Sequence, residues 1–168
     1  YNGQTKHFLI CLNVEINNQQ QEYQVLFNQQ WYNESLSKLS ANPKYSKICG
    51  VIRNLQEYNS LSHSNDKYII IAFLLRALME YTTKAYIDLF SLKKPADNLS
   101  SLITTVKGHL SDKGSLNKEE VKALKNTNDI ETLNGLIHDY GTTISSIDIK
   151  TTCSKYQKYF SVVFNRLS

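Results

Sequence analysis

Apolar residues recur at helical spacing along most of the chain. A short helix is predicted over residues 30–39, and a second begins at Pro43, since proline suits the first turn of a helix. The helices expected after it cover about residues 66–90, 99–110, 118–125, 129–140 and 148–167. With only two prolines and six glycines to interrupt it, the chain favours long regular elements.

Polar residues that favour helix ends support these limits. The expected caps are Asn65 or Asp66, Asp97 or Asn98, Asn117 with Glu120 in a capping box, and Asp129, while Gly141 ends the helix that Asp129 begins. The inward stripe of the last helix is expected to comprise Ile149, Cys153, Tyr156, Phe160, Val163 and Leu167. The pattern predicts a bundle in which each helix turns one apolar face inward.

The N-terminal region has a different pattern. Residues 7–16 alternate loosely, residues 22–27 are similar, and a polar link joins them, which predicts a short β-hairpin. A helix is the competing interpretation, because Gln and Glu are good helix formers. The predicted fold class is therefore mainly α, a helical bundle with a short N-terminal β-hairpin. We expect residues 1–64 to form an extension of the hairpin and two helices, packed on a bundle of residues 65–168.

Size and composition are those of one ordinary globular domain. The chain has 168 residues, of which 41% are hydrophobic and 20% are charged. Its net charge of +4 is compatible with an acidic or nucleic-acid partner, but no run of Lys or Arg indicates one. Three widely spaced cysteines favour a reducing cytosol over a disulfide framework or a zinc site. The apolar run of residues 68–79 is short and contains Arg76, so no membrane span is predicted.

Several kinds of site are not expected. Gly-rich phosphate loops, serine nucleophile elbows and paired carboxylates are missing from the sequence, which disfavours nucleotide and ester hydrolysis. No two histidines have metal-ligand spacing, so neither a metal nor another cofactor is predicted. Because the chain begins at Tyr1 and its only methionine is Met79, we expect it to be a module of a larger protein.

Two polar pairs stand out on otherwise apolar helices. Arg76 is the one charge in the run of residues 68–79, Glu80 follows four residues later on the same helix face, and Lys84 continues that line. A helix that is apolar all round is a buried helix, and buried charges are usually paired. Asn134 and His138 are also four residues apart. We expect the two pairs to form one polar cluster inside the helical core.

These residue types suit metal-independent phosphodiester cleavage. His138 exchanges protons near neutral pH and would act as general acid or base. The guanidinium of Arg76 would stabilise charge on phosphate, the amide of Asn134 would position substrate, and Glu80 would orient its neighbours. Two alternatives remain open. In the first, the cluster only satisfies polar groups in a bundle core, and in the second it binds a ligand or partner.

Residues 66–167, with a polar helix followed by a short Asn-x-x-x-His helix, resemble the HEPN superfamily. Those helical domains are common in prokaryotic toxins and antiviral systems, and many are RNases. The family motif is an arginine, a polar residue and then a histidine; Asn134 and His138 match its last two positions, and Leu133 stands at the arginine position. Arg76 is the hypothetical substitute for that arginine.

The resemblance implies a cytoplasmic module of a bacterial defence-type protein that binds or cleaves RNA. It also implies a homodimer, in which two copies of His138 line one groove between the protomers. The alternative hypothesis, which Leu133 favours, is a non-catalytic module for dimerisation or protein interaction. Its polar cluster would only fix the register of the helices, and its surface would recruit a partner subunit or another domain of the parent protein.

Overall fold

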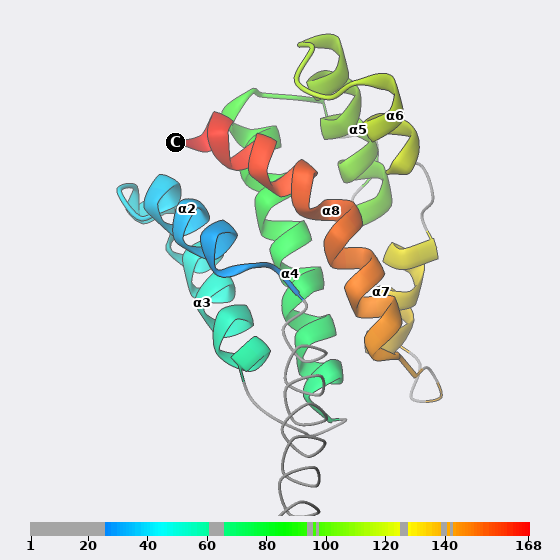
Figure 1. Ribbon diagram of the computed structural model, residues 1–168. Helices are drawn as coiled ribbons and strands as arrows, with labels where there is room; N and C mark the ends of the chain where they lie inside the picture. The colour runs from blue at the N-terminus through cyan, green and yellow to red at the C-terminus, as the bar shows by residue number, and fades with distance from the viewer. Residues whose placement is uncertain are drawn as a thin grey trace, which may run out of the picture.

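The computed structural model describes residues 26–60, 66–93, 96, 98–124, 128–138, 141 and 143–168. Every regular element within these ranges is a helix, and they contain no strand, so the predicted mainly α class and the helical bundle are confirmed. The predicted hairpin lies outside the described residues except for Leu26 and Phe27, which form a bend. Figure 1 shows the arrangement of the helices.

The described helices follow the order in which the sequence predicts them. They are α2 (Gln29–Leu39), a short 3₁₀ helix η1 (Pro43–Tyr45), α3 (Ser46–Ser60), α4 (Asp66–Leu89), α5 (Leu99–Asp112), α6 (Lys118–Ala123), α7 (Asn128–His138) and α8 (Ser146–Leu167). Pro43 begins the 3₁₀ turn that leads directly into α3, as expected of a proline at a helix start.

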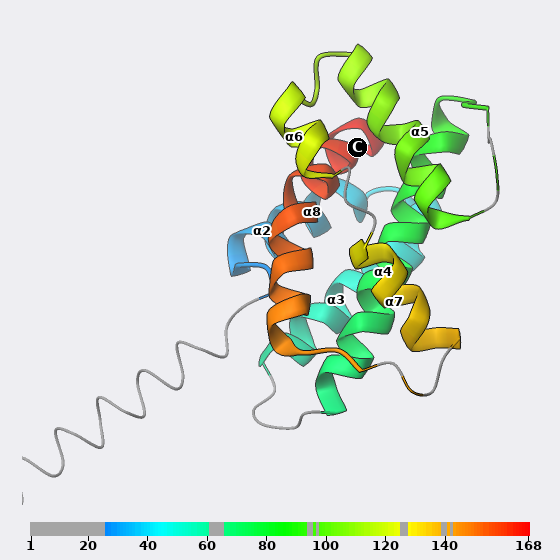
Figure 2. The ribbon, with the colours of Figure 1, turned by 90° about the vertical axis from the view of Figure 1, so that its right-hand side faces the viewer.

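Helix α4 is the centre of the bundle. Helices α3, α8, α5 and α7 all pack against it, and α2 packs on α3 and α8. In Figure 1, α3 and α7 lie on opposite sides of α4, and Figure 2 shows α5 and α7 on the side turned away from α2 and α3. The 24 residues of α4 thereby bring the start of α5 and the middle of α7 to neighbouring positions.

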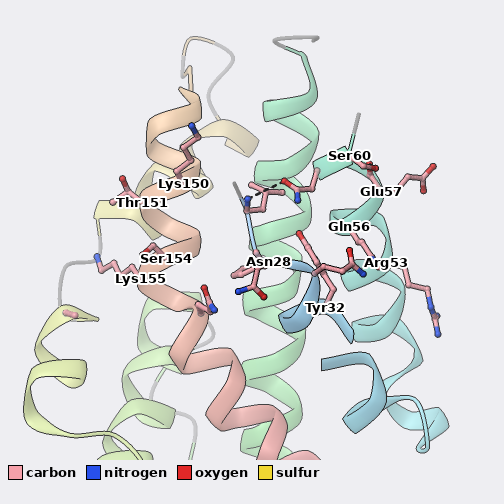
Figure 3. Close-up of a pocket in the computed structure, with 16 residues that line it drawn as sticks. Asn28, Tyr32, Arg53, Gln56, Glu57, Ser60, Lys150, Thr151, Ser154 and Lys155 are labelled. Carbon is pink, nitrogen blue, oxygen red and sulfur yellow. Dashed lines mark hydrogen bonds between the residues drawn. The ribbon is translucent and has the colours of Figure 1, made fainter. Parts of the chain in front are cut away.

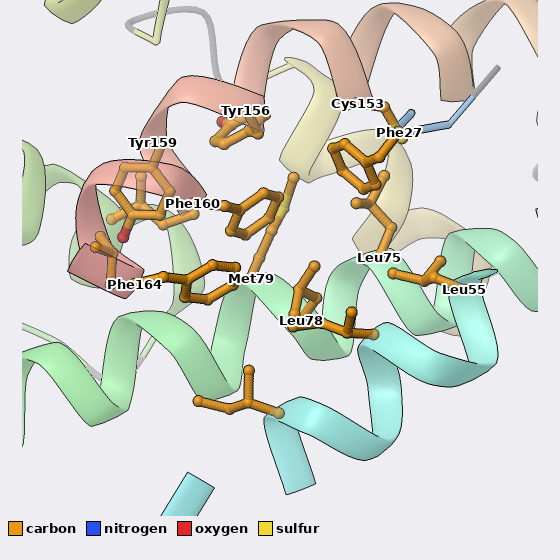
Figure 4. Packing of buried hydrophobic residues seen from close by; sticks show 14 of the residues in the cluster. Phe27, Leu55, Leu75, Leu78, Met79, Cys153, Tyr156, Tyr159, Phe160 and Phe164 are labelled. Atoms are coloured by element: carbon orange, nitrogen blue, oxygen red, sulfur yellow. The ribbon is translucent and has the colours of Figure 1, made fainter. Parts of the chain in front are cut away.

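The core is filled by the stripes that the sequence predicts. All six predicted inward residues of α8 are buried, as are the corresponding apolar residues of α3 and α5. Figure 4 shows Phe160 beside Tyr156, Tyr159 and Phe164 of the same helix and above Met79 of α4. The rings of Phe160 and Phe164 stack with centroids 6.0 Å apart. Burial of several large aromatic rings provides much of the apolar surface that stabilises the fold.

Two helix starts differ from the prediction. Helix α8 begins at Ser146, because Ser145 caps it and Asp148 completes a capping box as the third residue of the helix. Helix α7 begins at Asn128, so Asp129 lies within its first turn instead of capping it. The carboxylate of Asp129 forms an ion pair with Lys155, which holds α7 against α8. The predicted caps Asn98 and Asn117, with the Glu120 capping box, are confirmed.

The apolar sequence of α4 predicts a helix that is buried all round, but in the structure part of its surface is exposed. Ile69, Ile70 and Phe73 are 47%, 40% and 43% exposed on one side of its first half. Four neighbouring helices pack on other sides of α4, whose second half also has exposed residues such as Tyr81 and Leu89. None of the described helices combines the length and apolar character needed to cross a membrane.

Candidate functional site

Three of the four predicted site residues meet where α4 and α7 pack together. Nε of Arg76 donates to Oδ1 of Asn134 at 2.8 Å, and Nη1 of Arg76 donates to Oε2 of Glu80 at 3.0 Å. Nζ of Lys84 donates to Oε1 of Glu80 at 2.5 Å. The helical line Arg76, Glu80 and Lys84 therefore meets Asn134 in one connected network of hydrogen bonds.

His138 is the last residue of α7. It follows Asn134 by one helical turn, so positions 134 and 138 share a face of the helix. Its side chain lies outside the described part of the structure. The placement of its imidazole beside Arg76 therefore stays a prediction.

The ammonium and guanidinium groups keep Glu80 ionised. The hydrogen bond from Lys84 is the largest influence and lowers the pKa of Glu80 below its ordinary value; partial burial opposes the shift, and the charges of Lys84 and Arg76 reinforce it. Both oxygens of this carboxylate are engaged, one by each cation. Glu80 thus fixes the orientation of Arg76 and Lys84.

The network lies at the surface, which differs from the expected position inside the core. The side chains of Arg76 and Glu80 are 24% and 25% exposed. They open onto a small cavity of about 220 Å³ between α4, α5 and α7. Its lining residues are Arg76, Glu80, Lys84, Asn98, Leu99, Leu102 and Asn134, and we call it the Arg76 pocket.

Hydrogen-bond donors dominate the Arg76 pocket. A guanidinium has five N–H donors, and acceptors among the described residues engage only two of those of Arg76. Asn134 accepts from Arg76 through Oδ1, so its amide nitrogen is the atom left for a ligand. Asn98 accepts from the backbone N–H of Ser101 and likewise leaves its amide nitrogen unused by described residues. The site is therefore suited to an anion.

The sequence did not predict the part of the pocket that α5 contributes. Asn98 is recognisable as a helix cap, but a capping pattern does not reveal which other helix lies near it. In the structure, Asn98 and Leu99 bring the start of α5 to the pocket. The positive end of a helix dipole and its free backbone N–H groups add to the preference for an anion.

Leu133 stands where the resemblance to the HEPN superfamily leads us to look for an arginine. It is 2% exposed and belongs to the hydrophobic core. A side chain at this position points away from the pocket, because neighbouring residues of a helix do not share a face. Arg76 of α4 provides a guanidinium at the pocket and is hydrogen-bonded to Asn134, the residue after Leu133.

A larger cavity of about 1230 Å³ lies between α2, α3 and α8 (Figure 3). Its lining mixes charges of both signs, with Arg53 and Lys150 as well as Glu57. Leu26 and Ser60 also line it, and both adjoin residues outside the described ranges. Nothing in its lining selects a class of ligand, and no function is assigned to it.

The described residues contain no group of three or more His, Cys, Asp or Glu side chains arranged to hold a metal ion. Cys49 and Cys153 are buried free thiols, and burial raises the pKa of both. A raised pKa disfavours the reactive thiolate. These cysteines therefore serve as apolar core residues.

Comparisons of the chain with models of known protein families, with curated proteins and with solved structures found no match.

Proposed function

We propose that this chain is a HEPN-like module of a cytoplasmic, bacterial defence-type protein, and that it binds and cleaves RNA without a metal. The observation that carries the proposal is the set of unused N–H donors in the Arg76 pocket. Phosphate oxygens accept hydrogen bonds and carry negative charge, so they match both the donors and the cations of this pocket.

The pocket holds its donors in place before a ligand arrives. Glu80 orients Arg76 from one side, and Oδ1 of Asn134 orients it from the other. The outer edge of a guanidinium fixed in this way forms two parallel hydrogen bonds to a phosphate. Preorganised donors also favour the extra negative charge that develops on phosphate during cleavage, because they need no rearrangement at that moment.

In the proposed reaction, a ribose 2′-oxygen attacks the adjacent phosphorus. The 2′-O–P bond forms while the P–O5′ bond breaks, giving a 2′,3′-cyclic phosphate and a free 5′-hydroxyl. A general base takes the 2′-hydroxyl proton, and a general acid gives a proton to the departing 5′-oxygen. His138 acts in one of these roles, and Arg76 with Asn134 holds the phosphate.

A homodimer would supply both roles. One imidazole cannot accept and donate a proton at the same moment, whereas two protomers bring two copies of His138. Closed two-fold dimers are the commonest oligomers, and a two-fold axis near the ends of both α7 helices would place these residues in one groove.

The test is RNA cleavage by the purified chain in excess EDTA. We expect the parent to cleave single-stranded RNA and His138→Ala to lose cleavage while keeping the parent melting temperature. His109→Gln is the matched control, because His109 is hydrogen-bonded to Tyr86 and does not line the Arg76 pocket. Absence of cleavage by the parent, or equal cleavage by folded His138→Ala, contradicts the catalytic proposal.

A second candidate function is a non-catalytic dimerisation module whose polar cluster is structural. The observation that favours it is the exposed trio Ile69, Ile70 and Phe73 on α4. Adjacent exposed apolar residues often mark a protein interface. Here we propose a second copy of the same chain as the occupant, since two identical apolar patches can cover each other across a two-fold axis.

Sedimentation velocity of the parent and of Phe73→Ser tests this candidate. The dimerisation module predicts a dimer for the parent, a monomer for the variant, and no RNA cleavage by either. Ile147→Ser is the matched control, because Ile147 is 71% exposed on α8 and is not part of the trio. A parent that remains monomeric at high micromolar concentration rules out this role.

A further inference from the structure

A second small cavity lies between α4 and the start of α3. Its volume is about 180 Å³, and its lining residues are Lys44, Tyr45, Lys47, Ile48, Tyr81, Lys84, Ala85 and Asp88. We call it the Tyr81 pocket. Lys84 lines both this cavity and the Arg76 pocket, so one side chain connects the two.

Local structure determines which side chains reach the Tyr81 pocket. Asn42 caps η1 by accepting from the backbone N–H of Lys44, and this turn places Lys44 and Lys47 beside α4. On α4, Tyr81 and Lys84 are three residues apart and therefore share a face. Tyr45 also lines the pocket and is buried.

Cations outnumber carboxylates in the Tyr81 pocket. Lys44, Lys47 and Lys84 line it, against Asp88 alone among the described lining residues. Lys44 and Lys47 are exposed, and Tyr81 is 38% exposed, although most large apolar and aromatic side chains in the described part of the chain are buried. An accessible aromatic ring between ammonium groups is the combination that single-stranded nucleic acids require: stacking for a base and positive charge for the phosphates.

We propose that the Tyr81 pocket is a nucleotide-binding subsite for single-stranded RNA. The base of one nucleotide stacks on Tyr81, and Lys44 and Lys47 contact its phosphates. The neighbouring phosphate of the same strand reaches the Arg76 pocket past Lys84. This inference rests on the proposed function, because it extends the RNA strand from the Arg76 pocket.

The two pockets are connected by Lys84, which lines both. Arg76 and Tyr81 are five residues apart on α4, about 7.5 Å along the helix axis and about 140° around it. A strand that contacts both pockets therefore passes around α4 over Lys84. A duplex keeps its bases stacked inside the helix, so Tyr81 selects an unpaired strand.

The experiment is a fluorescence-anisotropy titration of a labelled single-stranded RNA, repeated at several salt concentrations. We expect Tyr81→Ala to bind roughly 5- to 100-fold more weakly than the parent, from the stacking of one base. Tyr81→Phe keeps the ring and should bind as the parent does. The double change Lys44→Gln, Lys47→Gln should reduce the slope of log affinity against log salt by about 1.4, the value for two phosphate contacts of a single strand.

Matched controls separate this subsite from general charge and from the Arg76 pocket. The double change Lys118→Gln, Lys122→Gln removes the same charge from exposed positions of α6. The slope of log affinity against log salt should then stay near that of the parent. Competition with a hairpin duplex and with a free mononucleotide shows whether an unpaired strand, a duplex or the nucleotide alone is bound.

The outcomes are distinct. If the parent binds RNA, Arg76→Gln weakens binding and Tyr81→Ala binds like the parent, the subsite is wrong and the proposed function stands. If the parent binds no RNA, the proposed function fails and the subsite fails with it. Preference for the duplex over the single strand also contradicts the subsite, because stacking on Tyr81 needs an unpaired base.

Discussion

The guanidinium of Arg76 and the side-chain amide of Asn134 are joined at 2.8 Å, although 58 positions separate them in the chain. The bond connects the central helix α4 to α7, the helix that also carries His138. This bond uses the carbonyl oxygen of Asn134 and one N–H of Arg76, and Glu80 accepts from a second N–H. The three other N–H groups of Arg76 and the amide nitrogen of Asn134 remain for a ligand of the pocket.

This bond should be measurable as a coupling free energy. In a double-mutant cycle of Arg76→Ala and Asn134→Ala, we expect the two losses of unfolding free energy to be non-additive by about 1–2 kcal/mol, since the donor is charged and partly buried. Urea unfolding of the four proteins gives the value. A coupling near zero would mean that the bond does not stabilise the packing of α7 on α4.

The stability of the protein should depend on Glu80 at acidic pH. The folded-state pKa of Glu80 is lowered from 4.5 by the hydrogen bond from Lys84. The unfolded chain therefore binds the proton more readily, and the stabilising contribution, present at neutral pH, is lost as pH falls below about 4.5. Its size is less than about 1 kcal/mol, because both partners are partly exposed.

Urea unfolding of the parent and of Glu80→Gln between pH 7 and pH 3 checks this expectation. The parent should be the more stable protein at pH 7, and the difference should shrink as the solution is acidified. A difference that grows on acidification would show that the sign of the pKa shift is wrong.

Phe160 should be one of the most sensitive positions of the core. It is fully buried and stacks on Phe164, so Phe160→Ala removes a large ring and leaves a cavity. We expect a loss of about 3–5 kcal/mol in the free energy of unfolding. Ile147→Ala, at an exposed position of α8, is the control and should change stability by less than about 0.5 kcal/mol. Similar losses in the two variants would contradict the packing described for α8.

Asp129 should control how firmly α7 is held. Its ion pair with Lys155 joins α7 to α8, and both side chains are largely buried. Asp129→Asn weakens that pair and should cost about 1–3 kcal/mol. Hydrogen exchange should become faster in α7, whereas Glu119→Gln, at an exposed position of α6, should leave the exchange of α7 near that of the parent. Unchanged exchange in Asp129→Asn would show that this ion pair does not hold α7 against α8.

The sequence predicts the helices well because each one must bury an apolar face. Five apolar residues of η1 and α3 recur at helical spacing and are all buried in the structure: Tyr45, Ile48, Cys49, Ile52 and Leu55. Local signals of this kind depend only on nearby residues. The start of α8 was also readable, since Ser145 and Asp148 have capping-box spacing, but the prediction placed the start at Asp148.

Relationships between helices were predictable only in part. The pairing of Arg76 with Glu80 follows from their spacing, and the shortage of polar residues nearby suggested that Asn134 would join them. Sequence could not show that α5 starts beside this cluster, or that one side of α4 stays exposed. Both depend on how the helices pack, which no local pattern determines. The catalytic role of His138 stays a prediction.

The most direct test of the central claim, that the Arg76 pocket binds RNA phosphate, is the RNA affinity of Asn134→Asp. This change keeps an oxygen acceptor for Arg76, so the fold should keep or exceed the parent stability, yet it replaces the amide donor with a negative charge. Asn33→Asp, at an exposed position of α2, makes the same change of charge outside the pocket.

We expect Asn134→Asp to bind single-stranded RNA at least about tenfold more weakly than the parent, a loss of about 1.4 kcal/mol or more, and Asn33→Asp to bind nearly as the parent does. Equal RNA binding by folded Asn134→Asp and the parent, or no binding by the parent at all, would contradict the account.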